Sequence, residues 1–233
     1  PSQYNAGKEE RYGVDLTVSN HTKINRDFSI DNSFVFGFSR DKQIDIAESM
    51  GTYSIPRFRR TGKSASQLRG YIAEGLFKDQ AEIDNSPRQN GKPMHGDIRY
   101  RDLNGDSEIT ADDRDVIANP EPDFFGGWFN SVNYKSWNLS FVFQFSKGGQ
   151  AFLNDLQNSA SGIVGNSIQR MMYRNTWTED NKDARYARLT VLDQSGNTNY
   201  SDRYVFETSY LRLKNITLSY ELSRNWFKKI YLQ

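Results

Sequence analysis

Residues 123–146 read DFFGGWFNSVNYKSWNLSFVFQFS, and this stretch decides the fold. Within 137–146, apolar residues occupy every second position, and this period of two indicates a strand with one apolar and one polar face. Residues 123–134 keep the same period, and only Lys135–Ser136 separates the two runs. The stretch therefore predicts an antiparallel hairpin with a very short turn.

The same alternation recurs on both sides of the hairpin. In the run that ends at residue 39, phenylalanines crowd a single face, which is unusual for a small soluble sheet and suits a face turned towards lipid. The last run begins near residue 229 and stops in mid-pattern. We predict strands near 12–20, 27–39, 123–134, 137–146, 204–222 and 229–233.

Short and very long connections alternate along the chain, and the long ones span 40–122 and 147–203. In an up-and-down sheet, the short turns then lie at one end and the long loops at the other, as in bacterial outer-membrane barrels. Apolar residues at helical spacing predict helices at 66–77, 151–158 and 167–177 inside these loops. The fold class that we predict is mostly β: an incomplete transmembrane antiparallel β-barrel segment, one domain over 1–233, whose long extracellular loops contain short helices.

Aromatic residues make up 14% of the 233 residues. Such rings collect at the two membrane interfaces of a barrel, where one end of the ring is apolar and the other is wet. The rings that we expect there are Trp128, Tyr134, Trp137, Tyr220 and Trp226.

Residues 102–113, DLNGDSEITADD, have the spacing of a calcium loop. Such a loop needs side-chain oxygens at positions 1, 3 and 5, a backbone carbonyl at 7 and an acid at 12, because a hard cation takes six to eight oxygens. Thr110, followed by an acid three positions on, also predicts the start of a helix. The candidate calcium ligands are Asp102, Asn104, Asp106, Glu108 through its carbonyl, and Asp113.

Two residues depart from that pattern. Ser107 stands at position 6, where glycine eases the sharp turn, and Asp113 is one methylene shorter than the usual glutamate. The alternative is an Asp/Asn-rich turn that holds no ion. Because the loop has no second copy in the chain, it predicts a structural calcium and not a calcium sensor.

Composition excludes several classes of function. The formal net charge is +1, so there is no electrostatic case for nucleic acid. Cysteine is absent, which removes disulfides, thiolate metal sites and thiol nucleophiles. The two histidines, His21 and His95, are far apart, which argues against a histidine zinc site. No residue is assigned to catalysis, and we predict that the chain is not an enzyme.

Several segments together resemble the SusC/RagA type of TonB-dependent outer-membrane transporter. They are GDIRYRDLNGDSEITADDRDVIANPEPDF at 96–124, GGWFNSVNYKSWNLSFVFQFSKGG at 126–149, RNTWTEDN at 174–181, YARL at 186–189 and SYLRLKNITLSYEL at 209–222. The resemblance implies a large plugged barrel in the outer membrane of a Gram-negative bacterium. It would import oligosaccharides, glycans or peptides with energy from TonB, under a SusD-like surface lipoprotein. In that family the acidic loop at 102–113 is extracellular and calcium-like.

About six strands are recognised here, whereas plugged outer-membrane transporters have about 22. We therefore expect a C-terminal portion of such a transporter, without its last strands, that does not transport alone. Two alternatives stay open: a soluble extracellular calcium-stabilised β-rich carbohydrate-binding module, with Trp128, Trp137 or Trp177 as its sugar platform, and a hydrolase with paired carboxylates. The observation that separates the first alternative from the barrel is whether protein covers the face with Phe34, Phe36, Phe141 and Phe143.

Overall fold

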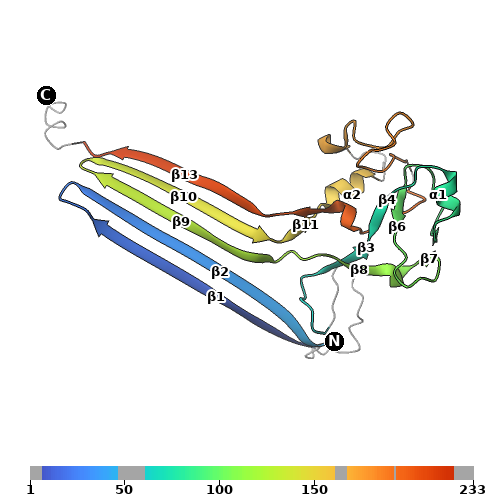
Figure 1. Cartoon of the computed structure of the whole chain (residues 1–233), viewed down its shortest axis with the longest axis horizontal. Coiled ribbons are helices and arrows are strands. Elements are labelled where there is room, and N and C mark those ends of the chain that lie inside the picture. Colours follow the sequence, from blue (N-terminus) through green and yellow to red (C-terminus); the bar gives the residue numbers. More distant parts are fainter. Residues whose placement is uncertain (1–6, 47–60, 161–166, 192, 223–233) are drawn as a thin grey trace, which may run out of the picture. The chain divides into compact units, whose positions relative to one another are not determined.

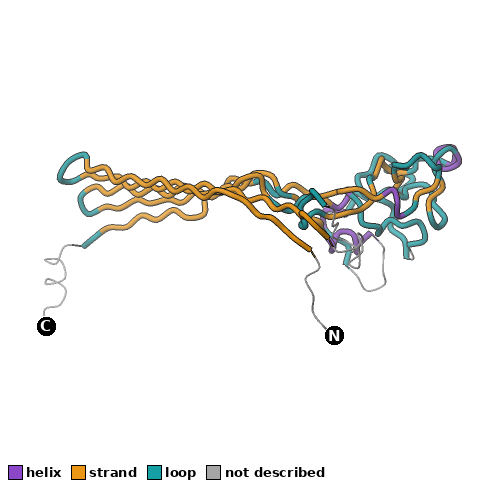
Figure 2. The backbone as a smooth tube through the Cα atoms, turned by 90° about the horizontal axis from the view of Figure 1, so that it is seen from below, coloured by secondary structure: helices purple, strands orange, loops and turns teal. Residues whose placement is uncertain are grey.

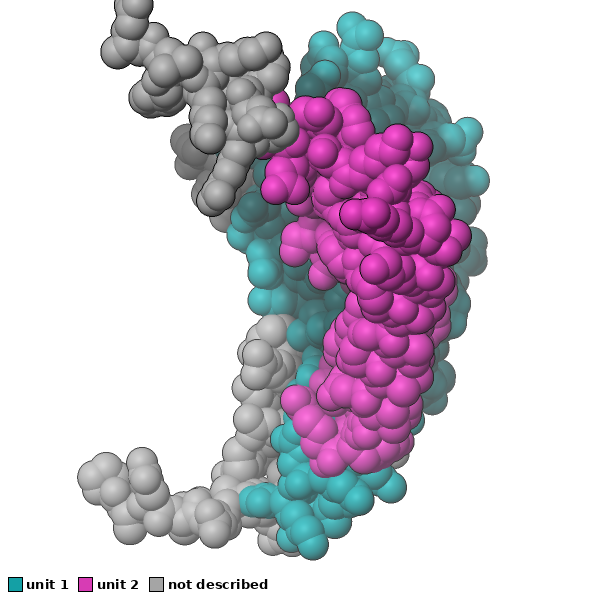
Figure 3. Space-filling model, turned by 90° about the vertical axis from the view of Figure 1, so that its left-hand side faces the viewer, with its two compact units in different colours: residues 1–10, 41–120, 150–207 teal, residues 11–40, 121–149, 208–233 magenta. Residues whose placement is uncertain are grey.

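A computed structural model of the chain describes residues 7–46, 61–160, 167–191 and 193–222. The chain divides into two compact units, which Figure 3 shows in different colours. Unit 1 comprises Pro1–Glu10, Asp41–Pro120 and Gln150–Glu207; unit 2 comprises Arg11–Arg40, Glu121–Gly149 and Thr208–Gln233. In chain order the elements are β1 (Gly7–Lys23), β2 (Phe28–Ile46), β3 (Leu68–Tyr71), β4 (Ala73–Leu76), α1 (Gln80–Asp84), β5 (Arg88–Gln89), β6 (Ile98–Tyr100), β7 (Glu108–Ile109), η2 (Ala111–Asp113), β8 (Arg114–Ala118), β9 (Pro122–Tyr134), β10 (Trp137–Gly148), β11 (Gln150–Phe152), α2 (Asn154–Ala160), η3 (Arg170–Met172), η4 (Asp202–Tyr204), β12 (Val205–Glu207) and β13 (Tyr210–Tyr220) (Figure 1).

Unit 2 is built on a five-stranded sheet in the order β1-β2-β9-β10-β13, which is open, with β1 and β13 at its edges. β9 pairs antiparallel with β2 and β10, and β10 pairs antiparallel with β13. Tyr134 pairs with Trp137 across the two-residue turn, so the predicted hairpin is confirmed. Figure 2 shows the strands as a thin layer, and Figure 1 shows the β1–β2 and β9–β10 turns at the same end of it.

Pairing register gathers the apolar residues of neighbouring strands on one face of the sheet. Trp128 of β9 lies opposite Phe34 of β2 and Phe143 of β10, and the Trp128 and Phe143 ring centroids are 6.1 Å apart. Within the described part of unit 2, no second layer covers this face. Its exposed apolar side chains include those of Val14, Leu16, Val18, Phe34, Trp128, Leu139, Leu213, Ile216 and Leu218.

Two asparagines interrupt this apolar face. Asn32 of β2 pairs with Asn130 of β9, and the Asn130 Nδ2 donates a hydrogen bond to the Asn32 Oδ1. Phe141 of β10 lies opposite Asn130 on the other side. Because the two carboxamides share a hydrogen bond, the desolvation penalty of the pair on an apolar surface is lower than that of two separate amides.

The opposite face carries a row of polar side chains across four strands. His21 of β1 contacts Asp31 of β2 (Nδ1 to Oδ1, 2.5 Å), and Asn133 of β9 donates to the second oxygen of Asp31 at 3.2 Å. Asn138 of β10 donates to the Oδ1 of Asn133 at 2.7 Å. This polar row lies near the short turns. The opposite face of the sheet carries aromatic rings at the same level.

Two long segments leave the sheet of unit 2 and return to it. At each of them, hydrogen bonds join the point where the segment leaves to the point where it returns. Arg40 of β2, the last residue of unit 2 before the first long segment, donates to the carbonyls of Pro122 (2.8 Å) and Asp123 (3.0 Å) and to the Asp123 carboxylate (3.1 Å). At the second long segment, the Gly148 amide donates to the Ser209 hydroxyl at 2.9 Å. Residues that are far apart in sequence are thereby held together where each loop begins and ends.

The strands of unit 2 lie where the alternation predicts them, with different ends. β1 and β2 are longer than predicted, while the run predicted at 204–222 is divided into β12 and β13 by residues 208–209. The strand predicted at 229–233 lies outside the described residues.

Unit 1 is held by a core in which tyrosines dominate. Tyr71 of β3 and Tyr100 of β6 pack at a tilt, with ring centroids 5.0 Å apart, and Tyr204 of η4 is buried with them. Burial raises the pKa of both Tyr100 and Tyr204, which keeps their hydroxyls protonated as donors. They donate to the carbonyls of Gly196 (2.7 Å from Tyr100) and Asn197. The rest of the core is formed by Leu76, Ile98, Ile109, Leu156, Met172, Trp177, Tyr186 and Ala187.

Asp97 of unit 1 is fully buried. Arg188 forms two hydrogen bonds to its carboxylate, at 2.7 and 3.2 Å, and the Asn197 Nδ2 donates a third at 2.8 Å. The Met94 amide donates to the same carboxylate at 2.8 Å. One buried carboxylate thus ties together three segments that are up to 100 residues apart.

The helix predicted at 66–77 is wrong, because this segment forms β3 and β4. β3 pairs with β8, and β4 pairs with β6. Gly70 packs so tightly that an added Cβ would lie 2.3 Å from the Tyr200 carbonyl oxygen, and Gly75 has a φ of 142°, far from the helical region. The apolar residues at helical spacing instead belong to two short strands.

Of the other two predicted helices, the one at 151–158 is partly wrong and the one at 167–177 is mostly wrong. Residues 150–152 form β11, and the helix α2 begins only at Asn154. In 167–177, only the short η3 is helical, because Arg174 has a φ of 60° and the Trp177 amide bonds to the Tyr186 carbonyl at 2.9 Å.

Removing the arginine that faces Asp97 should destabilise unit 1. In Arg188→Ala, the buried carboxylate loses its charged partner, and we expect local stability to fall by about 3 kcal/mol. Hydrogen exchange of the Ile98 amide, which bonds to Asn197, measures this change. In the control Lys182→Ala, which removes an exposed pair with Glu179, we expect a change within about 0.5 kcal/mol. Equal exchange in the two variants would contradict the role given to Asp97.

Candidate functional site

The acidic loop at 102–113 is closed by hydrogen bonds from its own backbone. Asp102 accepts from the amides of Gly105 (2.7 Å) and Ser107 (2.8 Å), one on each carboxylate oxygen. Asp106 accepts from the Glu108 amide at 2.8 Å, and the Asn104 Oδ1 accepts from the Asp106 amide at 2.9 Å. Each of these oxygens has a further lone pair, so the first half of the loop could still coordinate a cation.

Asp113 differs from the other predicted ligands because it is fully buried and its oxygens are already in use. One oxygen accepts from the amides of Leu103 (2.8 Å) and Asn104 (3.4 Å), and the other from the Thr110 amide (2.7 Å). Burial by itself raises the pKa of Asp113, but the hydrogen bonds from Thr110, Leu103 and Asn104 outweigh it, and the net pKa is lowered. With Thr110, Asp113 also forms the capping box of η2, so a helical turn begins at the predicted place.

Among the described residues, no three Asp, Glu or His side chains converge where they could hold a metal ion. An ion at this loop would therefore need side chains to turn, and Asp113 would have to exchange backbone donors for the ion. The calcium site formed by Asp102, Asn104, Asp106, Glu108 and Asp113 stays a prediction.

Ser107 carries backbone strain at the position where glycine was expected. Its φ is 67°, in the left-handed region that costs a residue with a Cβ about 1–2 kcal/mol. Gly105, two residues earlier, has a φ of 77° and open space around the position of a Cβ. The loop therefore makes the glycine-like turn despite the substitution.

Trp177 does not form a sugar platform. It is only 8% exposed, and its ring packs on Gly96, where an added Cβ would lie 2.3 Å from the Trp177 Cδ2. Trp128 and Trp137 are 40% and 48% exposed, and both lie on the apolar face of the unit 2 sheet. Three tryptophans that look equivalent in the sequence are thus divided between a core and an apolar surface.

The aromatic rings near the short turns form a group. The Trp137 and Tyr220 centroids are 4.7 Å apart, and those of Phe28 and Tyr134 are 6.2 Å apart. Trp128 lies farther along the sheet, beside Phe34, Phe143, Phe145 and Leu211, which together line an apolar hollow of about 360 Å³. Trp226, the fifth ring predicted at an interface, lies outside the described residues.

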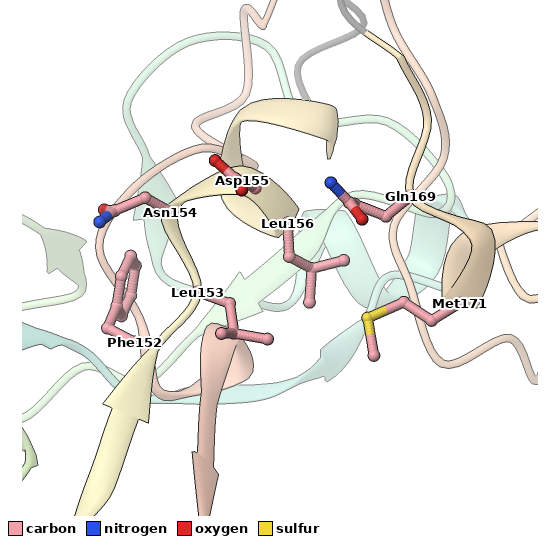
Figure 4. Close-up of a pocket in the computed structure, with 7 residues that line it drawn as sticks. All are labelled: Phe152, Leu153, Asn154, Asp155, Leu156, Gln169 and Met171. Atoms are coloured by element: carbon pink, nitrogen blue, oxygen red, sulfur yellow. The ribbon is translucent and has the colours of Figure 1, made fainter. Parts of the chain in front are cut away.

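Unit 1 has a second hollow, also of about 360 Å³, that the sequence did not suggest. Figure 4 shows Leu153 and Leu156 beside one another, with Met171 across from them. Phe152, Asn154, Asp155 and Gln169 complete the lining, so apolar side chains and a few amide and carboxylate groups surround the hollow. In the sequence, its apolar lining residues appear only at the spacing that predicts a helix.

Exchanging serine and glycine in the acidic loop tests its backbone conformation. In Ser107→Gly, we expect the free energy of opening the loop to rise by about 1 kcal/mol, because the strain of the left-handed conformation is relieved. In the matched variant Gly105→Ser, we expect a loss of similar size, because a Cβ there meets no atom and only the backbone cost changes. Hydrogen-exchange protection of the Ser107 and Glu108 amides gives both values. Changes of the same sign in the two variants would contradict this account.

No helix in the described part of the chain is long and apolar enough to span a bilayer. No protein-family model matches the chain. Among curated proteins, it is 27% identical over 239 residues to the TonB-dependent receptor P3 of Formosa agariphila, covering 98% of this chain and 23% of the relative. It is 25% identical over 235 residues to the TonB-dependent receptor SusC of Bacteroides thetaiotaomicron, covering 97% of this chain and 22% of the relative.

Among solved structures, the RagAB peptide transporter matches with a TM-score of 0.69 and 23% identity, over 96% of this chain and 24% of that chain. The RagAB peptide importer in its closed-closed state matches with a TM-score of 0.67 and 24% identity. This likeness shows that the mostly β chain has the fold of part of a barrel transporter. The chain spans less than a quarter of the curated relatives given above. Its resemblance to the SusC/RagA type of TonB-dependent receptor is confirmed, and it extends over nearly the whole chain.

Proposed function

We propose that this chain forms part of the wall and two outer loops of a TonB-dependent outer-membrane importer. The observation that carries the proposal is the two-faced sheet of unit 2, with an uncovered apolar face and a hydrogen-bonded polar face. A wall between lipid and a polar lumen needs this division, because lipid cannot satisfy polar groups. Unit 2 is the wall, and its apolar face contacts lipid.

The dimensions of the apolar face support this proposal. Phe124 and Tyr134 lie at its two ends on β9, ten residues apart, which corresponds to about 33 Å along a strand. Strands of outer-membrane barrels tilt by about 35–45°, which reduces the height to about 25 Å, the height of the apolar band of such barrels. The ring group at Tyr134, Trp137 and Tyr220 then lies at the periplasmic interface.

The cargo that we propose is an oligosaccharide, a glycan or a peptide, and the partners are a SusD-like surface lipoprotein and TonB. Support comes from curated relatives that are TonB-dependent receptors, and from the fold shared with a structure titled as a peptide transporter. The long segments that contain unit 1 are then the extracellular loops, and the chain takes no catalytic part.

We further propose that the acidic loop binds one calcium ion weakly, using the side-chain oxygens of Asp102, Asn104 and Asp106 and the Glu108 carbonyl. Asp113 would have to give up backbone donors to join them, and this exchange lowers the affinity. Extracellular modules bind calcium with dissociation constants of about 10⁻⁴–10⁻³ M, and we place this loop in that range. The ion would stiffen a loop that the backbone already closes.

Calcium titration by calorimetry of the complete protein tests this proposal. We expect a dissociation constant of about 10⁻⁴–10⁻³ M, and loss of the signal in the double variant Asp102→Ala/Asp106→Ala. Asp112→Asn is the matched control, because no backbone donor of the loop bonds to its exposed carboxylate. No heat at 10 mM calcium would overturn the ion, and micromolar affinity would overturn the role given to Asp113.

A soluble carbohydrate-binding module is less well supported. It needs the apolar face of the sheet to pack against a second sheet, and it needs exposed tryptophans away from that face. The described part of unit 2 is a single layer, and Trp177 is buried.

Arginine substitutions on opposite faces of β13 test the transmembrane wall. Ile216 is 64% exposed on the apolar face, and Thr217 is its neighbour on the polar face. In Ile216→Arg, we expect a cost of about 2–4 kcal/mol in lipid, and therefore less folded barrel in the outer membrane and less uptake of oligosaccharide or peptide. In Thr217→Arg, we expect near-normal assembly. Equal assembly of the two variants in the outer membrane would contradict the proposal.

A further inference from the structure

A small hollow in unit 1 brings two arginines together. It has a volume of about 290 Å³ and is lined by Ala73, Arg185, Asp202, Arg203 and Val205. No salt bridge of Arg185 or Arg203 is found in the part of the chain that the structure describes. Among the five lining residues, Asp202 carries the one carboxylate, so two guanidiniums share the hollow with a single negative charge, and each positive charge is more costly beside the other.

The two side chains are held in place by different contacts. The Arg185 guanidinium lies over the rings of Tyr186 and Phe206, 5.7 and 5.5 Å from their centroids. Arg203, in the short η4, donates from one terminal nitrogen to the Arg185 carbonyl. Neither arginine is therefore a loose surface side chain.

One donor of Arg203 remains unused. Its Nε is buried and has no hydrogen-bond partner among the described residues, and such an orphan donor costs about 1–3 kcal/mol. Burial lowers the pKa of Arg203, and the charge of Arg185 lowers it further, although Tyr204, Asp202 and Tyr100 oppose this. A carboxylate in the hollow would offset the two positive charges, because it accepts two hydrogen bonds from a guanidinium, and it would also satisfy the Nε once the Arg203 side chain turns towards it.

The charge in the hollow fits a singly charged ligand. Asp202 is already bound, since its Oδ1 accepts from the Ala73 amide at 2.8 Å. Two guanidiniums and one carboxylate leave a net charge of +1, which matches one ligand carboxylate better than a doubly charged phosphate. The volume lies just below the range for ligand pockets, roughly 300–1,000 Å³, so the hollow takes one terminal group and not a whole substrate.

We propose that Arg185 and Arg203 form a subsite for a carboxylate of the imported substrate. This inference rests on the proposed import function and adds a chemical class to it: cargo that carries a carboxylate. Two sources share this chemistry, the free C-terminus of a peptide and the carboxylate of an acidic sugar.

The test measures binding to the complete outer-membrane protein that carries this chain, purified in detergent. Trialanine is compared with its C-terminal amide, and trigalacturonate with its methyl ester, by isothermal titration calorimetry. We expect one free acid to bind at least about tenfold more tightly than its neutral partner. The pair that shows the difference identifies the source. Equal binding within both pairs, or no binding of any of the four probes at millimolar concentration, overturns the subsite.

Variants then assign the difference to these arginines. Arg185→Gln is the main variant, because Arg185 is exposed and we expect unit 1 to fold without its charge; we expect it to remove the preference for the free acid. Arg185→Lys keeps the charge and should keep part of the preference, and Arg203→Gln should act like Arg185→Gln if it folds. Arg88→Gln is the control, because Arg88 is exposed and paired with Glu108 elsewhere in the unit. An unchanged preference in Arg185→Gln overturns the proposal.

Cellular uptake separates this subsite from the import function itself. If deleting the gene abolishes uptake of the probe while Arg185→Gln leaves uptake and binding unchanged, the import function stands and the subsite is wrong. If the deletion leaves uptake unchanged, the import function fails, and the binding data still decide the subsite.

Discussion

Register between neighbouring strands is the constraint on which unit 2 depends. Side chains along a strand alternate between the two faces, so a slip of one residue would exchange the faces of a strand completely. The two-residue turn at Lys135–Ser136 sets the pairing of β9 with β10, and β2 and β13 then continue it on either side. The aromatic face and the polar row from His21 to Asn138 are two results of the same pairing.

Unit 1 solves a different problem, because its strands are too short to hold one another. Tyrosines supply large apolar rings together with hydroxyls that bond to loop carbonyls, and the carboxylate of Asp97 collects donors from three distant segments. Buried polar groups that are fully satisfied specify one arrangement among many loose ones. The GDI segment at 96–98 and the YARL segment at 186–189, which first appear only as matching motifs, are joined physically through Asp97 and Arg188.

The sequence predicts the sheet better than the loops, and the reasons are physical. Alternation and a short turn are local signals, so the hairpin at 123–146 could be recognised without any knowledge of the rest. The helix predicted at 66–77 also rests on a local signal, apolar residues at helical spacing, and it is wrong. The segment instead pairs with β6 and β8, and the conformations of Gly70 and Gly75 favour strands there. No spacing rule connects Asp97 to Arg188, or Arg185 to Arg203 in a shared hollow. The acidic loop was recognisable by its pattern, but the burial of Asp113 was not.

The hydrogen bonds that close the two long segments affect how freely the lengths of these segments can vary. Arg40 holds the entry and exit of the first long segment together, and Ser209 does the same for the second. The entropy of closing a loop grows only slowly with its length, by about 0.6 kcal/mol for each doubling. The segments between these closing contacts can therefore be lengthened, shortened or exchanged with little change in the stability of the sheet. The sheet of unit 2 therefore places little constraint on the length of the two segments that it closes.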